Sequence, residues 1–165
     1  MSVDHDDLVR GATFRPLHEV PPLQLSSASI RFTATGAQTN GEFGLFRYDM
    51  PPGPGGPRPH VHRTFSESFY VLGGSVDFYD GTGWVTASEG DFIYIPPSGV
   101  HAFRIGNDGA AAASMLIVFS PGVAREGYFR ELAEIAASGR QLTAEEWTEV
   151  YERNDQFMVD DPGSA

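Results

Sequence analysis

Short runs of alternating, β-branched or aromatic residues, separated by glycine- and proline-rich turns, constrain the fold of this chain more than any other feature. Such runs are typical of half-buried β-strands, in which successive side chains point to opposite faces. Between two of the runs, residues 80–83 (Asp-Gly-Thr-Gly) indicate a hairpin. Strands are expected over residues 27–35, 43–50, 69–72, 75–79, 84–87, 91–95, 100–105 and 114–119. So many short strands at close spacing predict an antiparallel sandwich or a small barrel.

The pattern changes from strand-like to helical after residue 121. Apolar residues recur at helical spacing through residues 125–138, and Gly139 is a typical stop signal. Thr143 and Glu146 match a capping box, which predicts the start of a second helix. The apolar stripe of this second helix contains Trp147, Val150 and Tyr151.

We therefore expect one domain with three parts. An N-terminal arm covers residues 1–24, a barrel covers residues 25–122, and two C-terminal helices within residues 123–165 pack on the barrel. A chain of 165 residues is long enough for one sizeable core, and we find no internal repeat. The proline-marked arm and the aromatic helices predict a homodimer, and residues 160–165 are expected to be frayed.

The composition excludes several classes of function. With a formal net charge of −11, the chain is not expected to bind nucleic acid or anionic membranes, because phosphate binding needs a basic face. The sequence has no cysteine and no lysine, which excludes thiolate chemistry, lysine Schiff bases and a Walker-type phosphate loop. An acidic start and the lack of a long apolar run predict neither signal peptide nor membrane span, and therefore a cytoplasmic protein that acts on a small molecule.

One segment, residues 59–67, combines three side chains that can bind a metal. His60 and His62 are two positions apart, so in a β-strand both imidazoles point to the same face. Glu67 is out of phase with this pair, because a period of two from His62 skips position 67. We therefore expect a turn within residues 63–66, after which a new strand points Glu67 back toward the two imidazoles.

A third histidine of the expected barrel, His101, lies in the strand predicted over residues 100–105. Any one histidine is more often an ordinary core or surface residue than a ligand, and we interpret His5 and His18 of the arm as ordinary surface residues. All three barrel histidines are expected within strands. Two imidazoles on one face, a third on another strand and a carboxylate at a fixed offset together favour a site for one divalent transition metal.

Two stretches of the chain resemble the two sequence motifs of the cupin superfamily. The first motif is an early Gly, then His-x-His, three or four residues, Glu, six residues and Gly. The second is Gly, five residues, Pro and a His five positions later, with an inner Gly after the Pro and an Asn at the end. The matching positions are His60, His62, Glu67 and Gly74 in the first motif and Gly90, Pro96 and His101 in the second. The resemblance covers about residues 40 to 120.

Three positions depart from the motifs. Pro54 stands where the first motif has an early Gly, Ser98 where the second motif has an inner Gly, and Ile105 where the second motif ends in Asn. All three departures concern turns rather than candidate ligands, so metal binding is still expected.

The resemblance implies an all-β, antiparallel jelly-roll barrel of roughly six to eight strands with a metal inside. His60, His62, Glu67 and His101 would be the ligands of one divalent transition metal, for which Fe, Mn, Ni, Co and Zn are all suitable. Three neutral imidazoles and one carboxylate would leave the site with a net charge of about +1, which favours an anionic oxygen donor.

Within that superfamily, the chain resembles small single-domain cupins of the quercetin 2,4-dioxygenase type. This implies a dioxygenase acting on a small aromatic or enolic, flavonol-like substrate, with Glu67 as both ligand and general base. Two alternatives stay open: non-redox isomerisation, cyclisation or decarboxylation with the metal as Lewis acid, and binding of a small molecule without catalysis. The complete ligand set disfavours a metal-free cupin whose histidines only bind substrate.

Other motifs carry little weight. Residues 53–56 are too rich in proline to open a helix and bind phosphate, and no Gly-x-Ser-x-Gly elbow occurs. The aromatic residues Phe69, Phe78, Phe103 and Phe119 are most simply barrel core. The alternative is that Phe103 and Phe119 line a pocket for a flat substrate.

Overall fold

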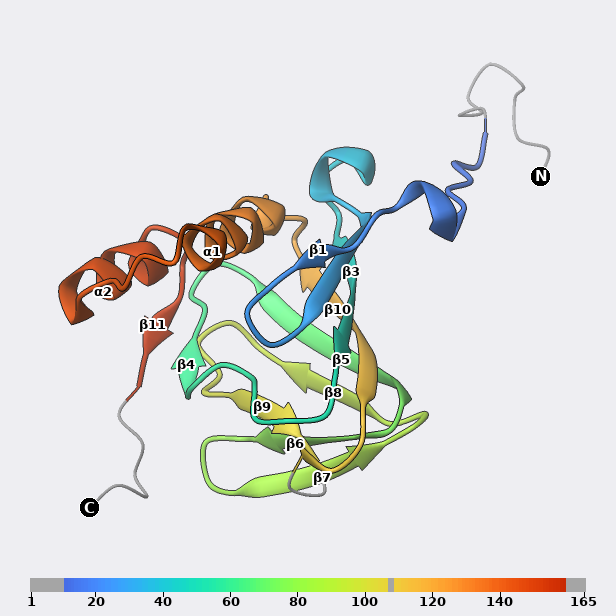
Figure 1. Ribbon diagram of the computed structural model, residues 1–165. Helices are drawn as coiled ribbons and strands as arrows, with labels where there is room; N and C mark the ends of the chain where they lie inside the picture. The colour runs from blue at the N-terminus through green and yellow to red at the C-terminus, as the bar shows by residue number, and fades with distance from the viewer. Residues whose placement is uncertain (1–10, 107–108, 160–165) are drawn as a thin grey trace.

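The computed structural model describes residues 11–106 and 109–159 (Figure 1). The strands are β1 (Leu23–Gln24), β2 (Ser29–Ala34), β3 (Gly44–Met50), β4 (His60–Val61), β5 (Ser66–Gly73), β6 (Ser75–Tyr79), β7 (Trp84–Ser88), β8 (Phe92–Ile95), β9 (Ala102–Ile105), β10 (Ala113–Ser120) and β11 (Phe157–Met158). The helices are the 3-10 helices η2 (Leu17–Glu19) and η3 (Gly36–Gln38) and the α-helices α1 (Arg125–Ser138) and α2 (Ala144–Glu152). The predictions for His5, for the acidic start of the chain and for a frayed C-terminus lie outside the described residues.

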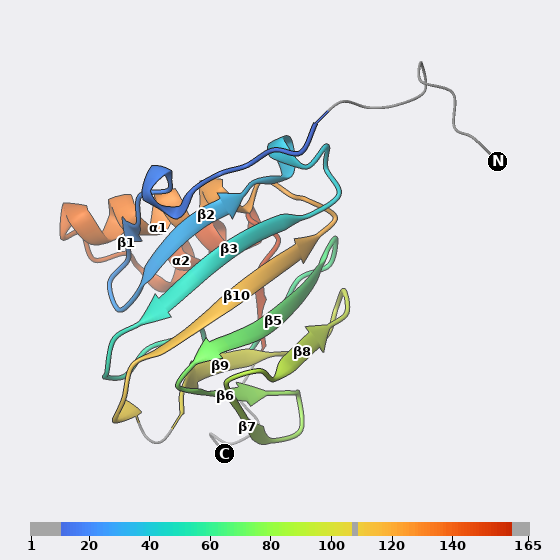
Figure 2. The same cartoon turned by 90° about the vertical axis from the view of Figure 1, so that its right-hand side faces the viewer.

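The strands form a layered, antiparallel β-structure. A six-stranded sheet has the order β1-β2-β3-β10-β5-β8, and a three-stranded sheet has the order β7-β6-β9. Figure 2 shows the long strands of the first sheet side by side, with the smaller sheet below them. Every pairing between named strands is antiparallel, as predicted. Within the described residues, however, the pairings remain separate sheets and do not close into one continuous hydrogen-bonded barrel.

Alternation along the long central strands builds the core. In β3, Phe46, Tyr48 and Met50 are buried, while the residues between them are half-buried. The neighbouring strand β10 buries Met115 and Ile117 in the same way. Each such side chain contributes about 1.5–3 kcal/mol when fully buried. A register slip by one residue would turn these side chains outward, so the hydrophobic pattern fixes the pairing of β3 with β10.

The four phenylalanines that were assigned to the core are all buried, which confirms that interpretation. Phe69 lies at the centre of the group, with its ring centroid 4.9 Å from that of Phe78 and 5.6 Å from that of Phe103. Phe119 packs edge-on against Phe46, with 5.1 Å between ring centroids.

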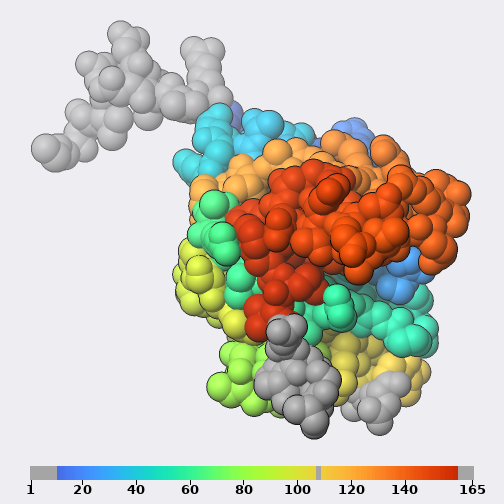
Figure 3. All heavy atoms as spheres, turned by 90° about the vertical axis from the view of Figure 1, so that its left-hand side faces the viewer, coloured from blue at the N-terminus to red at the C-terminus, as the bar shows by residue number. Residues whose placement is uncertain are grey.

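The two C-terminal helices are those that the sequence predicted. Helix α1 spans the predicted residues and ends at Gly139, whose left-handed φ of 67° explains the glycine. At the start of α2, the Thr143 hydroxyl accepts a hydrogen bond from the amide of Glu146, and the Glu146 carboxylate accepts one from the amide of Thr143. Figure 3 shows both helices and β11 covering one face of the molecule. None of the helices in the described residues is long and apolar enough to span a membrane.

The described part of the N-terminal arm lies along the body. One Arg15 nitrogen donates hydrogen bonds to the main-chain oxygens of Phe32 and Thr33, both at 3.2 Å. Arg31 of β2 donates to the main-chain oxygen of Val20 at 2.8 Å, and β1 pairs with β2. The arm is therefore held to the edge of the six-stranded sheet.

The proline-rich stretch over residues 51–57 is a loop, as expected, and its glycines permit close packing. Gly56 has a φ of +116°, and a Cβ at this position would lie only 1.9 Å from the main-chain oxygen of Phe103. Any larger residue at position 56 would therefore push the loop away from β9, directly ahead of the strand that carries His60.

The structure corrects the prediction that all three barrel histidines lie within strands. His60 begins β4, but His62 follows the end of this two-residue strand, and His101 precedes β9 in an isolated bridge to His60. Strands β1 and β11 were not predicted, because two residues are too few to show a period.

Candidate metal centre

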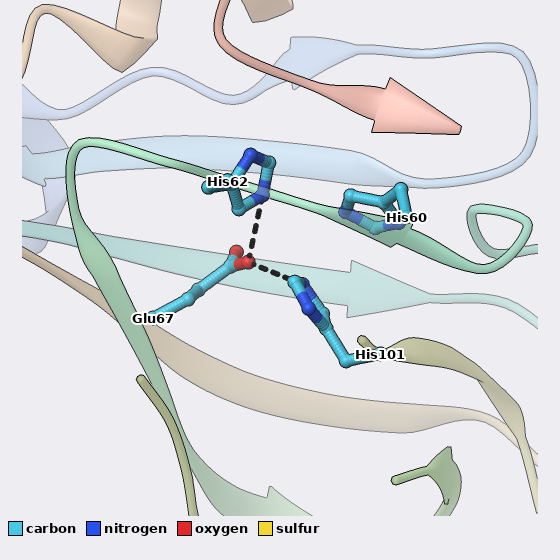
Figure 4. Close-up of side chains that lie close together, drawn as sticks. All are labelled: His60, His62, Glu67 and His101. Atoms are coloured by element: carbon cyan, nitrogen blue, oxygen red, sulfur yellow. Dashed lines mark hydrogen bonds and ion pairs between the residues drawn. The ribbon is translucent and has the colours of Figure 1, made fainter. Parts of the chain in front are cut away.

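Four buried polar side chains, His60, His62, Glu67 and His101, meet at one point between the strands (Figure 4). One possible ligand atom from each side chain can be chosen so that all four atoms lie within 4.8 Å of one another. The residues come from three separate segments: β4 and the residue after it, β5, and the residue before β9. The structure thus brings together the four side chains that the sequence singled out.

Main-chain hydrogen bonds fix the two segments that carry the histidines relative to each other. His60 and His101 exchange both of their main-chain hydrogen bonds, each at 3.0 Å. The amide of Ser98 donates to the main-chain oxygen of His62 at 2.6 Å. Ser98 has a φ of 66°, so it adopts the left-handed conformation for which the cupin motif uses glycine. Between β4 and β5 the chain turns as predicted, which returns Glu67 to the two imidazoles.

Each imidazole is oriented by a hydrogen bond from its Nδ1 atom to a main-chain oxygen. The Nδ1 of His60 lies 2.8 Å from the oxygen of Arg58, and the Nδ1 of His101 lies 3.0 Å from that of Gly99. His62 uses the oxygen of Asp155, at 2.6 Å. Because a carbonyl oxygen can only accept, each Nδ1 must carry the proton. In the neutral rings the unprotonated atom is then Nε2, which is the state that binds a metal.

The arrangement around Glu67 requires a cation. Glu67 Oε2 lies 2.9 Å from Nε2 of His101 and 3.2 Å from Nε2 of His62. An unprotonated Nε2 and a carboxylate oxygen both accept hydrogen bonds, so a proton or a metal ion must lie between them. The Nε2 of His62 is buried and has no hydrogen-bond partner among the described residues.

The spacing of the four side chains also fits a metal. Ligand atoms of one ion with bonds of about 2.1 Å lie ~3–4 Å apart, so the set needs only a slight contraction to bind one ion. Soft thiolates are absent from the chain, and imidazole with carboxylate suits Fe, Mn, Co, Ni and Zn.

The electrostatics keep the site in its metal-binding protonation state. Burial, helped by the neighbouring His101 and His62, lowers the pKa of His60 to about 3, so this ring is neutral near pH 7. Burial alone would raise the pKa of Glu67, but the adjacent His101 and His62 outweigh this effect and hold the pKa well below its usual range. Glu67 is therefore an ionised carboxylate.

The cluster opens onto a cavity of about 590 Å³ between the sheets and the C-terminal helices. Aromatic side chains form much of its wall: Tyr48, Phe103, Tyr128, Phe129, Trp147 and Tyr151. Phe103 therefore belongs to both the core and the cavity, whereas Phe119 packs in the core and does not line the cavity. Of the two phenylalanines that were considered as lining for a substrate pocket, only Phe103 lines the cavity.

Sequence reasoning missed two residues of the site, Arg125 and Asp155. Arg125, the first residue of α1, is buried and lines the cavity. Asp155 lies in the turn after α2 with a φ of 53°, and its main-chain oxygen orients His62. The positive charge of Arg125 at the start of the helix was visible in the sequence, but no local pattern places Arg125 or Asp155 beside His62, which lies 63 and 93 positions earlier in the chain.

Comparison with known proteins agrees with this geometry. A family model described as a cupin domain matches residues 46–119. The matched region contains all four candidate ligands, whereas the helices that wall the cavity lie outside it.

The proteins to which this chain is similar are named for different activities. The chain is 28% identical over 106 residues to quercetin 2,3-dioxygenase of Bacillus subtilis (strain 168), a match that covers 63% of this chain and only 29% of that enzyme. Among solved structures, a predicted oxalate decarboxylase from Thermotoga maritima gives a TM-score of 0.57 at 21% identity, covering 66% of this chain and 99% of that one. The polyketide cyclase RemF from Streptomyces resistomycificus gives a TM-score of 0.56 at 20% identity. The match covers 67% of this chain and 80% of the RemF chain. These two structures confirm the predicted jelly-roll architecture, and at such identity they show the fold alone.

Proposed function

We propose that this cupin is a metal-dependent enzyme, and specifically a dioxygenase that acts on a small aromatic or enolic substrate of the flavonol kind. The observation that carries the proposal is the meeting of three imidazoles and one carboxylate at an aromatic-lined cavity of about 590 Å³. This volume is within the usual range for small-molecule sites. The partial similarity to a quercetin 2,3-dioxygenase supports the choice of reaction.

The chain would hold the metal through His60, His62, Glu67 and His101. When bound, a divalent metal would supply a Lewis-acid position for a substrate oxygen, and a redox-active one could also exchange electrons. The aromatic walls would orient a flat substrate with its polar edge toward the cluster, and the helices would exclude water from that edge.

Glu67 would also serve as the general base. Its Oε2 faces His62 and His101, while no hydrogen bond from a described residue occupies its Oε1, which is available to a substrate hydroxyl. A carboxylate with a lowered pKa is a weak base. If substrate binding moves Glu67 away from the two imidazoles, burial then raises its pKa, and the same carboxylate becomes able to take the hydroxyl proton.

The test starts with elemental analysis of protein expressed without added metal. The protein, loaded in turn with Fe, Mn, Co and Ni, is then mixed with quercetin in air while absorbance and dissolved oxygen are followed. We expect flavonol and oxygen to disappear together with at least one metal, and not at all in the Glu67→Gln variant. His18→Ala, on the exposed arm, is the matched control and keeps full activity.

Each other outcome identifies a different function. No loss of flavonol with any of the four metals rules out the proposed reaction. Turnover of a substrate under strict anaerobiosis would instead indicate non-redox isomerisation, cyclisation or decarboxylation. A ligand that binds stoichiometrically and is recovered unchanged would indicate a small-molecule-binding cupin.

The same proposal includes a homodimer without nucleic-acid or membrane partners. It rests on the proline-marked arm and on the net charge of −11. Light scattering of the metal-loaded protein would give twice the chain mass of 17.9 kDa for a dimer.

A further inference from the structure

The cavity contains a buried positive charge that forms no ion pair with a carboxylate of the described residues, although Glu67 and Asp155 lie near enough to act on it electrostatically. Arg125 is only 5% exposed, and its guanidinium is fully charged at any pH the protein meets. No carboxylate of the described residues lies within 4.0 Å of it. Burial disfavours such a charge and lowers the pKa of Arg125. A buried cation of this kind is costly unless an anion or a full set of acceptors is supplied.

The acceptors that Arg125 does have are neutral and incomplete. One terminal nitrogen donates to the main-chain oxygen of Asn154 at 2.6 Å, and the other donates to Oε1 of Gln156 at 2.7 Å. The Nε atom is buried and has no hydrogen-bond partner in the part of the chain that the structure describes. The aromatic rings of Tyr128, Phe65 and Phe129 lie 4.0, 5.5 and 5.9 Å from the guanidinium carbon. These rings stabilise the cation but bring no opposite charge and accept no hydrogen bond from Nε, so Arg125 can still bind an anion.

The guanidinium also lies close to the metal cluster. Phe65 contacts both, since its ring centroid is 5.5 Å from the Arg125 guanidinium carbon and 4.4 Å from the centroid of His62. Arg125, His62 and Glu67 all line the same cavity. A molecule of two fused rings can therefore reach from the guanidinium to the cluster.

The mouth of the cavity adds further positive charge. Arg58 and Arg140 also line it. Arg140 pairs with Glu146, but Arg58 is exposed and makes no ion pair to a described residue. On a chain with a net charge of −11, a cavity lined by three arginines and a single carboxylate, that of Glu67, is a local exception that attracts anions.

We propose that the cavity binds an aromatic anion whose carboxylate, or other ring-bound oxyanion, is held by Arg125, while the ring packs between the aromatic walls. This proposal builds on the proposed function, because it names the substrate class of the same site. The planar fork of a guanidinium suits a carboxylate, and the buried Nε atom, which has no partner among the described residues, supplies a free donor. Tyr48 and Phe103, edge-on with 5.6 Å between centroids, and Trp147, stacked on Tyr151, supply the flat surfaces.

The test compares two probes of equal shape, 2-naphthoate and its uncharged amide, 2-naphthamide. Binding is measured by calorimetry on full-length protein at moderate salt. We expect the acid to bind at least tenfold more tightly than the amide. Since the amide keeps the ring, this comparison isolates the charge and needs no variant.

Two variants then assign the preference to Arg125. In Arg125→Gln the preference for the acid should fall to about twofold or less, whereas Arg125→Lys should retain part of it. Arg130→Gln is the matched control, because Arg130 is exposed on the same helix, lies over Phe32 and does not line the cavity. It removes the same charge and should leave the preference unchanged.

Equal binding of acid and amide by the native chain would overturn the proposal, as would equal losses in Arg125→Gln and Arg130→Gln. If Arg125→Gln does not fold, the native comparison and Arg125→Lys still test the proposal.

Repeating the titrations after chelation of the metal separates this proposal from the proposed dioxygenase function. A preference that survives chelation belongs to Arg125, even if the protein proves inactive as a dioxygenase. A preference that vanishes on chelation assigns the carboxylate to the metal and removes the role of Arg125.

Discussion

The Nδ1 atom of His62 lies 2.6 Å from the main-chain oxygen of Asp155, 93 positions later in the chain. Asp155 also binds the turn that follows His62, because its carboxylate accepts hydrogen bonds from the amides of Arg63 and Thr64 and from the Thr64 hydroxyl. Next to it, β11 pairs with β4. A segment outside the matched cupin domain therefore orients one of its candidate ligands.

We expect replacement of Asp155 to weaken metal binding without removing a ligand. Loss of groups that orient a ligand typically costs roughly 10–100-fold in metal affinity. In Asp155→Ala the turn loses its carboxylate and the residue at φ 53° loses a side chain that favours this conformation. Asp155→Asn should recover most of the affinity, and Glu152→Ala, exposed on α2, should change nothing. Metal affinity measured by competition with a chelator checks this, and unchanged affinity in Asp155→Ala would contradict it.

We expect the native protein to bind one divalent ion per chain and to lose it when a ligand is removed. His101→Ala should bind less than a tenth of the metal that the native chain binds, while His18→Ala should bind the full amount. Metal at 100 times its dissociation constant should stabilise the native chain by about 2.7 kcal/mol. Elemental analysis and thermal melts with and without chelator measure both effects. Equal metal content in native and His101→Ala protein would show that the ion lies elsewhere.

The buried Tyr128 predicts a loss of stability at alkaline pH. Burial raises the pKa of Tyr128 to about 12, although the nearby Arg125 opposes the shift. The unfolded chain then releases this proton near pH 10, before the folded chain does, so the contribution is complete below pH 10 and is lost as pH rises toward 12. Over this window the native chain should lose about 2–3 kcal/mol relative to Tyr128→Phe. Urea unfolding of both proteins from pH 8 to pH 11.5 tests this, and parallel curves would refute it.

Two phenylalanines on neighbouring strands should differ strongly in their effect on stability. Phe69 of β5 is 0% exposed and lies at the centre of the aromatic core, whereas Phe92 of β8 is 64% exposed. Phe69→Ala should cost about 3–5 kcal/mol, because it removes buried surface and leaves a cavity. Phe92→Ala should change the unfolding free energy by no more than about 0.5 kcal/mol. Denaturant unfolding gives both values, and similar losses would mean that Phe92 is covered in solution.

The strands and helices were largely predictable, because their patterns are local. The alternation in β3 and the capping box of Thr143 and Glu146 are each visible within a few residues. The metal cluster was predictable for a related reason, since a His-x-His pair, an out-of-phase Glu67 and a later His101 can meet only if the chain turns between them. Strand boundaries were less predictable, and His62 and His101 fall just outside β4 and β9.

The amino-acid sequence by itself determined the β-rich fold, the two helices and the identity of four candidate ligands, because side-chain period, turn chemistry and ligand type are properties of short stretches. Only the tertiary structure decided what surrounds those ligands. Arg125 and Asp155 act through contacts with residues 29 or more positions away, at Asn154 and at His62. Such contacts arise when α1, α2 and β11 fold back over the sheets, and no local pattern records which side chain of a helix then faces the cavity.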